Sequence, residues 1–193
     1  MNVDFGTGGP YEGAGAAADS GTFWNAATST SGSFLIASDG TTPTEVGFST
    51  TANWFGTRTS GGAIDLFTDY HGNWGVGSWD LTVTGLDDSA LYDLYLYASD
   101  DATGDGSVSQ GATFTVDGQS GRADSTNRST FVEGENYVLF QNVSASGGQI
   151  VINVADPEGV YLTNGFQVVR VPEPASMMLL AMAVGGLLFW RRR

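Results

Sequence analysis

The clearest hydrophobic pattern in this chain is an alternation of apolar and polar residues in its second half. Residues 79–84 alternate in steps of two, and within residues 91–97 the side chains of Tyr92, Leu94 and Leu96 share one side. Successive side chains of a strand point to opposite faces, so the pattern predicts half-buried strands with these three residues in the core. The opposite side of the second strand would carry the remaining residues, Leu91, Asp93, Tyr95 and Tyr97.

Short apolar runs of the same kind recur along residues 1–170 between glycine-rich and polar segments. Asp117-Gly118 follows one of them and is a hairpin signal, and Gly72-Asn73 is expected to lie in a turn. No segment in this range shows a convincing helical period. The further predicted strands are residues 33–37, 45–48, 63–67, 112–116, 137–140, 149–154 and 165–169.

This series of strands predicts an all-β fold. Eight or more antiparallel strands around one core imply a β-sandwich, most simply a jelly roll. Alternate positions on the clearest strands define the expected core, which consists of Leu94, Leu96, Phe114, Val116, Val138, Phe140, Ile150 and Ile152.

The tail breaks this pattern and divides the chain into a domain of residues 1–170 and a segment of residues 171–193. Pro172-Glu173-Pro174 is followed by an uncharged run, Met177–Trp190, and then by Arg191, Arg192 and Arg193. A helix over that run would be about 21 Å long, which is short against a hydrocarbon core of ~30 Å. We expect a single short membrane helix whose arginines stay on the cytoplasmic side, with the β domain on the far side.

Pro172-Glu173-Pro174, the short apolar helix and the arginine cluster together resemble the PEP-CTERM sorting signal. The resemblance implies an exported protein of a polysaccharide-producing Gram-negative bacterium. Exosortase, a membrane protease-transpeptidase, would recognise the signal while the helix holds the protein transiently in the inner membrane. The mature protein would then reach the cell surface or the extracellular matrix of a biofilm. The alternative is a plain tail anchor after a proline-rich linker, which needs neither the triplet nor so short a span.

Composition narrows the function classes. The chain has 193 residues, with 21 acidic residues against seven basic ones, all of them arginine. Residues 1–171 carry 20 acidic residues and four arginines, a net charge of −16. Such a surface repels phosphate backbones, so no nucleic-acid partner is expected. The absence of cysteine excludes disulfides and thiolate sites.

The folded region resembles the galactose-binding-like jelly-roll domains of secreted carbohydrate-active proteins. The segments that carry the resemblance are Val3-Asp4-Phe5-Gly6, Phe23-Trp24-Asn25, residues 91–97, Phe114-Thr115-Val116-Asp117-Gly118 and Asn164-Gly165-Phe166-Gln167-Val168. These are mostly core strands and specify fold better than ligand. Binding of extracellular polysaccharide is implied by this resemblance alone.

Aromatic residues are the candidates for such binding, because flat rings with an apolar face stack on sugar rings. Trp54 and Trp74 occur among glycine and asparagine residues that favour loops, and Tyr70 lies close to Trp74 in sequence. These three form the expected ligand site. Trp24 is a further candidate, whereas Trp79 begins a strand and is expected in the core. For each ring, packing into the core is the alternative.

An acidic loop suggests calcium. Counted from Asp101, residues 101–108 fit the first positions of a calcium loop loosely, and Asp105 supplies a second carboxylate. Ala112 occupies the position that requires a glutamate in an EF-hand, so only a looser site is predicted. The alternative is a solvated turn.

Catalytic groups are scarce. The single histidine, His71, nearly excludes His-based triads and multi-histidine metal sites. Asp65 and Asp69 could form a carboxylate pair of the kind glycosidases use, but chance pairs are expected among 21 acidic residues. We therefore expect no enzymatic activity. The alternatives to a structural matrix protein are a carbohydrate-binding module with a defined glycan and a hydrolase acting on polysaccharide.

The N-terminus lacks the features of an export signal. Residues 1–5 contain no basic stretch or long apolar run and instead look like a first strand. Because export requires a signal, we expect that a signal peptide is missing from this N-terminus.

Overall fold

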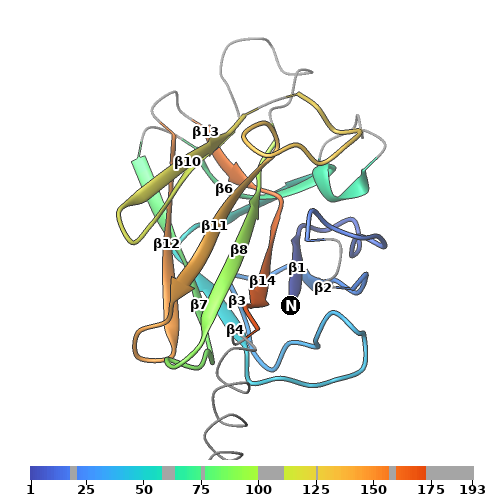
Figure 1. Cartoon of the computed structure of the whole chain (residues 1–193). Helices are drawn as coiled ribbons and strands as arrows, with labels where there is room; N and C mark the ends of the chain where they lie inside the picture. Colours follow the sequence, from blue (N-terminus) through green and yellow to red (C-terminus); the bar gives the residue numbers. More distant parts are fainter. Residues whose placement is uncertain are drawn as a thin grey trace, which may run out of the picture.

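A computed structural model describes residues 1–17, 21–57, 64–74, 77–99, 111–124, 126–156 and 160–172. The domain is an all-β sandwich of the jelly-roll class, as the strand pattern predicts. Two large sheets face each other, and a third, small sheet closes one end of the sandwich (Figure 1). The described part of the chain contains no α-helix.

The first large sheet has five strands and carries both ends of the folded chain. Its strands are antiparallel except for β1 and β2, which run parallel. A β-bulge between Phe140 and Val143 interrupts the pairing of the edge strand with its neighbour. The strand order is β11 (Tyr137–Ser144), β8 (Leu91–Tyr97), β14 (Gly165–Arg170), β1 (Asn2–Phe5) and β2 (Asn25–Ala27).

The second large sheet has six antiparallel strands. The predicted hairpin is confirmed at its edge, where Asp117 and Gly118 form the turn with φ of 48° and 77°. Both φ values are positive, as a two-residue hairpin loop with a type I′ turn requires. The strand order is β10 (Gln119–Ala123), β9 (Ala112–Val116), β12 (Gln149–Asp156), β7 (Gly77–Thr84), β4 (Gly47–Thr50) and β3 (Ser31–Gly32).

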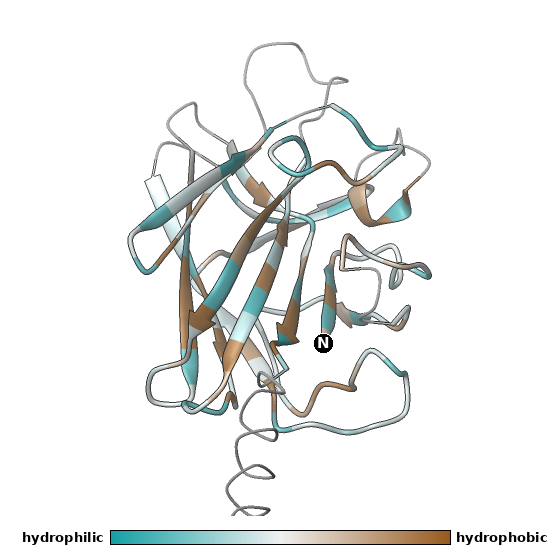
Figure 2. Cartoon of the chain, in the orientation of Figure 1, coloured by the Kyte–Doolittle hydropathy of each residue, from teal (hydrophilic) through white to brown (hydrophobic). Residues whose placement is uncertain are grey.

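The core lies between the two large sheets and confirms the alternation in the sequence. All eight predicted core residues belong to a single buried cluster, together with Trp79. Figure 2 shows the same alternation as hydrophobic and hydrophilic bands along β8 and β11. The outward side of β8 departs from the prediction at one position, because Tyr97, expected opposite the core, is fully buried in a second apolar cluster.

One sequence prediction is wrong in the small sheet. Its order is β13 (Val160–Thr163), β6 (Asp69–Trp74) and β5 (Trp54–Thr57). Gly72-Asn73, expected in a turn, lies within β6. A Cβ on Gly72 would come within 2.2 Å of the Tyr161 carbonyl oxygen, so glycine is needed there for the close approach of β13 rather than for a turn.

The strand predicted at residues 63–67 is also wrong. Asp65–Phe67 form a 3₁₀ turn, η2, closed by a hydrogen bond from the Thr68 N–H to the Asp65 carbonyl oxygen at 2.8 Å. The neighbouring side chains Leu66 and Phe67 are both fully buried. A half-buried strand would send two successive side chains to opposite faces, whereas the turn brings both inward.

In the first half, one predicted strand is absent and another is shifted along the chain. Residues 33–37 form no strand: only Ile36 makes an isolated bridge, and Phe34 is 73% exposed with a φ of 55°. The Asn25 side chain bonds the N–H of Ile36 at 2.9 Å and its carbonyl oxygen at 2.7 Å, while the backbone of Leu35 bonds the backbone of Thr44 and Val46 at 3.0 Å each. The strand predicted at 45–48 begins later, at Gly47.

Candidate functional site

The junction between the domain and the tail is firmly held. β14 is an inner strand, and beyond its end the Val171 N–H donates to the Leu91 carbonyl oxygen at 2.8 Å. Arg170 pairs with Asp87 at 3.0 Å. Pro172 is the last described residue and is exposed. The sandwich therefore runs directly up to the proline-rich segment.

The rest of the predicted sorting signal, Glu173, Pro174, Arg191, Arg192 and Arg193, lies outside the described residues, as does the predicted membrane helix. Within the described part of the chain, no helix has the length and apolar character needed to cross a membrane.

Sequence reasoning placed Trp54 and Trp74 in loops, and the structure corrects this, because Trp54 begins β5 and Trp74 ends β6. The Trp74 side chain lies outside the described residues. Trp24, a further candidate, follows the alternative of core packing: it is only 1% exposed, and its indole N–H donates to the Gly13 carbonyl oxygen at 2.8 Å. It packs edge-on against Tyr97 and Tyr11 in a second aromatic cluster.

The Trp54 ring is half-exposed. It packs on Tyr70 with ring centroids 4.9 Å apart, and Tyr70 in turn packs with Leu162 of β13. Tyr70 itself is buried and lies between the Trp54 ring and the interior of the domain. The small sheet thus holds Trp54 on an aromatic base, an arrangement suited to stacking on a sugar ring.

The single histidine is a core residue. His71 lies on the other face of β6, where its ring stacks on Phe55 at 4.0 Å. Its Nε2 lies 2.6 Å from Thr50 Oγ1 and its Nδ1 lies 3.0 Å from the Trp54 carbonyl oxygen. Burial lowers the pKa of His71 to about 4, so the ring is neutral near pH 7.

The acidic residues predicted to bind calcium or to form a carboxylate pair have different locations in the structure. Asp101 and Asp105, the predicted calcium ligands, lie outside the described residues, and the calcium site stays a prediction. Asp65 is exposed at the start of η2, whereas Asp69 is buried at the start of β6. Asp69 has Asp4 of β1 as its acidic neighbour. Among the described residues, no group of three His, Cys, Asp or Glu side chains is arranged to hold a metal ion.

Asp4 and Asp69 hold the N-terminal segment against the sandwich. Tyr11 N–H donates to Asp4 Oδ2 at 2.7 Å, and Gly8 N–H donates to Asp69 Oδ2 at 2.5 Å. Asp4 Oδ1 is buried and has no hydrogen-bond partner in the described structure. Desolvation raises the pKa of Asp4 to about 7, opposed by the Tyr11 hydrogen bond and reinforced by the charge of Asp69.

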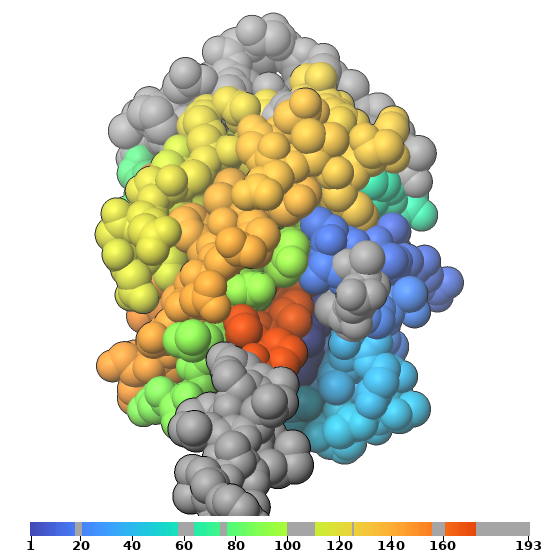
Figure 3. Space-filling view, viewed as in Figure 1, coloured from blue at the N-terminus to red at the C-terminus, as the bar shows by residue number. Residues whose placement is uncertain are grey.

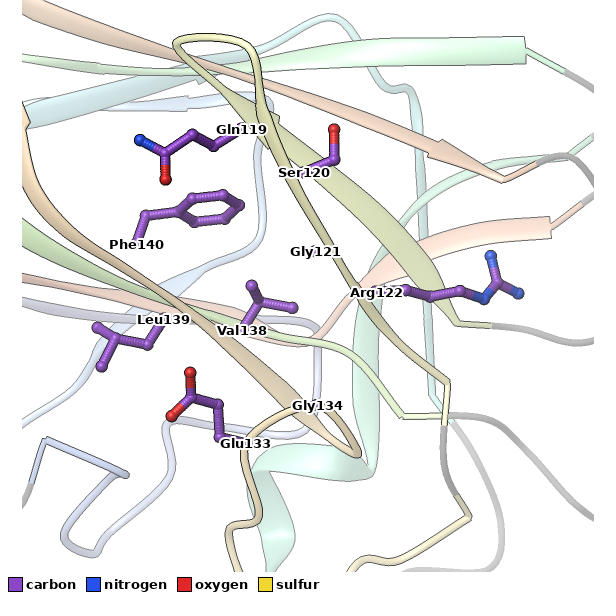
Figure 4. A pocket seen from close by; sticks show the side chains of 9 residues that line it. All are labelled: Gln119, Ser120, Gly121, Arg122, Glu133, Gly134, Val138, Leu139 and Phe140. Atoms are coloured by element: carbon purple, nitrogen blue, oxygen red, sulfur yellow. The ribbon is translucent and has the colours of Figure 1, made fainter.

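A shallow groove of about 300 Å³ runs between the edge strands of the two large sheets, β10 and β11 (Figure 4). Val138 and Phe140 form its apolar side, and Gln119 is among its polar residues. A Cβ on Gly121 would come within 2.4 Å of Val138 Cγ1, so this glycine lets β10 approach β11 closely. Leu139 points to the opposite side of β11 from Val138 and Phe140, toward the outer face of the sheet (Figure 4).

That outer face carries aromatic residues that sequence reasoning did not select. Tyr95 of β8 and Tyr137 of β11 are half-buried, with ring centroids 5.9 Å apart and planes inclined by 34°. The alternation predicted Tyr95 on the outer side of β8 but gave no partner for it. The signal that could have found the pair was the coincidence of tyrosines on the outward positions of two long strands.

Comparison with protein families supplies the deciding observation for the tail. One family, described as the PEP-CTERM protein-sorting motif, matches residues 170–193. These residues carry a PEP-CTERM sorting motif. The match begins at Arg170, the last residue of β14, so the motif follows the folded domain without a spacer. A motif of this kind implies an exported protein that exosortase processes.

Comparison with curated proteins gives no significant match. Among solved structures, TmCBM61 in complex with β-1,4-galactotriose is similar at a TM-score of 0.38 and 11% identity, over 64% of this chain and 88% of that one. An exo-β-1,3-galactanase from Phanerochaete chrysosporium, solved with galactose, is similar at a TM-score of 0.32 and 16% identity. That match covers 70% of this chain and 32% of the galactanase chain. Both are distant likenesses.

Proposed function

We propose that this protein is a non-enzymatic surface or extracellular-matrix component of a Gram-negative bacterium, displayed after exosortase removes its tail. The single observation that carries the proposal is the PEP-CTERM motif at residues 170–193. The fold supports it, because the sandwich is continuous up to Val171 and leaves the motif directly after the last strand. The inner membrane holds the protein only until processing.

Fractionation of an exosortase-positive host and its exosortase deletion strain tests the proposal. We expect the protein at the surface or in the medium of the first strain and in the membrane fraction of the second. Replacing Pro172, Glu173 and Pro174 by alanine should reproduce the deletion phenotype in the positive strain. Equal distribution in both strains would contradict the proposal.

The finer part of the proposal is that the displayed domain binds extracellular polysaccharide. Trp54 supports it, because a half-exposed tryptophan fixed on Tyr70 offers an apolar face for a sugar ring. The affinity should be weak, since sugars are well solvated and their desolvation offsets most of the gain. Retardation of the protein in gels that contain polysaccharide tests this part separately from sorting.

A further inference from the structure

The outer face of the five-stranded sheet presents a second aromatic surface, which we call the tyrosine platform: Tyr95, Tyr137 and Leu139, flanked by Asp93 and Glu133. Tyr95 lies opposite Leu139 in the pairing of β8 with β11, and Tyr137 lies opposite Tyr97. Figure 3 shows this face of the molecule, with β8 visible between β11 and the N-terminal segment. The platform lies on two long paired strands, which makes it rigid.

The buried neighbours hold the platform in place. Tyr97 is fully buried, and its ring lies 5.9 Å from that of Tyr137. Its hydroxyl donates to Gln167 Oε1 and accepts a hydrogen bond from the Ala16 N–H at 2.8 Å. The platform rings are therefore the outward edge of a packed aromatic cluster, and they lose little conformational freedom when a ligand covers them.

The polar groups of the platform remain available. Neither the Tyr95 nor the Tyr137 hydroxyl has a hydrogen-bond partner among the described residues. Glu133 lies close enough to act on the pKa of both tyrosines, and Asp93 on that of Tyr95. Asp93 Oδ1 accepts a hydrogen bond from the Asn142 N–H at 2.9 Å, which fixes this carboxylate beside the β-bulge. Two flat rings flanked by oxygen acceptors match the alternating apolar faces and hydroxyl donors of a sugar.

Charge narrows the class of sugar. Residues 1–171 carry 20 acidic residues against four arginines, a net charge of −16. The two charged groups that flank the rings are carboxylates as well. A polyanionic polysaccharide would meet like charge both at the platform and over the whole domain, so it is disfavoured.

We infer that the tyrosine platform is a binding site for neutral polysaccharide, with Tyr95 and Tyr137 as the stacking rings and Asp93 and Glu133 as acceptors for sugar hydroxyls. The inference rests on the polysaccharide-binding part of the proposed function and assigns it to a surface distinct from Trp54.

Affinity electrophoresis of the full chain in a zwitterionic detergent tests this, with soluble galactan or β-glucan in the gel and polygalacturonate as the anionic comparison. We expect retardation by a neutral polymer and none by polygalacturonate. The double variant Y95A/Y137A should weaken the interaction by about tenfold or more, because both stacking faces are lost. Y95F/Y137F should weaken it less, since the rings remain. The matched control F34A, which removes a 73% exposed aromatic ring that belongs to neither candidate surface, should bind like the wild type. W54A is measured in the same gels to test the small sheet.

Thermal melts accompany each variant. If Y95A/Y137A does not fold, the single variants Y95A and Y137A decide, with a several-fold loss in either one supporting the platform and an unchanged interaction in both overturning it. A folded Y95A/Y137A with unchanged retardation also overturns the inference, and loss of binding in W54A alone moves the site to the small sheet while polysaccharide binding stands. If no neutral polymer retards the protein, both the platform and the proposed polysaccharide binding are overturned. The proposed sorting of the tail is unaffected by that result.

Discussion

At the scale of single residues, the buried carboxyl group of Asp4 is the most unusual feature of the domain. Its Oδ1 has no hydrogen-bond partner in the described structure, and burial together with nearby Asp69 raises its pKa to about 7. The proton is thus bound more tightly in the folded state than in the unfolded chain, where the pKa is 3.8. The stabilising contribution of this proton is complete below pH 4 and is lost as the pH rises through 7.

The pKa shift of His71 makes stability increase with pH, whereas that of Asp4 makes it decrease, and the two pH ranges overlap. Burial lowers its pKa from 6.5 to about 4, so folding favours the neutral ring and stability is lost as the pH falls from 6.5 toward 4. The contributions of Asp4 and His71 to the pH dependence of stability therefore offset each other in the wild type. The contribution of either residue is measured by comparing a variant at that position with the wild type.

We predict that D4N is increasingly more stable than the wild type as the pH rises from 4 to 7. The amide avoids the cost of an unpaired buried charge, and its oxygen can still accept the Tyr11 N–H. The difference in unfolding free energy should approach zero at pH 4 and reach up to about 4 kcal/mol at pH 8. Urea unfolding of both proteins across this range measures it. A constant difference at every pH would show that Asp4 does not titrate as described.

At the scale of strands, the alternation of the sequence translates directly into burial. Within β12, Ile152 is fully buried whereas its neighbour Val151 is 46% exposed. Truncation of the buried residue removes core contacts and leaves a cavity, while truncation of the exposed one does neither.

We predict that I152A lowers the unfolding free energy by roughly 2–5 kcal/mol and V151A by less than about 1 kcal/mol. L94A on β8 should match I152A, because both residues belong to the same core cluster. Chemical denaturation provides the measurement. Similar losses in I152A and V151A would mean that the two faces of β12 are not distinguished as the structure shows.

The last strand also constrains the sorting motif. β14 lies between β8 and β1, and its hydrogen bonding extends to Val171, one residue before Pro172. A protease that binds its substrate as an extended segment must therefore work close against the folded sandwich.

We predict that inserting four to six glycine and serine residues between Val171 and Pro172 speeds processing in an exosortase-positive host. Pulse-chase labelling follows the loss of the precursor. The matched control is the same insertion between Gly147 and Gly148, in the exposed turn between β11 and β12, which should leave the rate unchanged. Equal rates for all three proteins would mean that the sandwich does not restrict access to the motif.

The sequence predicted the second half of the domain well because burial there depends on local alternation. Leu94, Phe114 and Ile152 could be placed in one core without knowing any long-range contact. Leu66 and Phe67 could not be, since both are buried by segments distant in sequence. The pairing of Tyr95 with Tyr137 depends on the register of β8 with β11, which alternation within one strand does not determine.

At the scale of the whole molecule, the candidate binding surfaces lie apart from the end of β14, which the sorting motif follows in the sequence. β13 and β6 of the small sheet lie at the upper end in Figure 1, and β14 stops at the opposite end. The tyrosine platform lies on the flank between them, on β8 and β11. A domain tethered by residues that follow β14 would therefore hold Trp54 away from the membrane and keep the platform accessible.

We propose that the tail is a processing signal and not a permanent anchor. Intact-mass spectrometry of the protein recovered from the surface or medium of an exosortase-positive host tests it most directly. We predict a mature mass that lacks the residues after Pro174. A mature pool that retains the full chain through Trp190 and the terminal arginines would contradict the account.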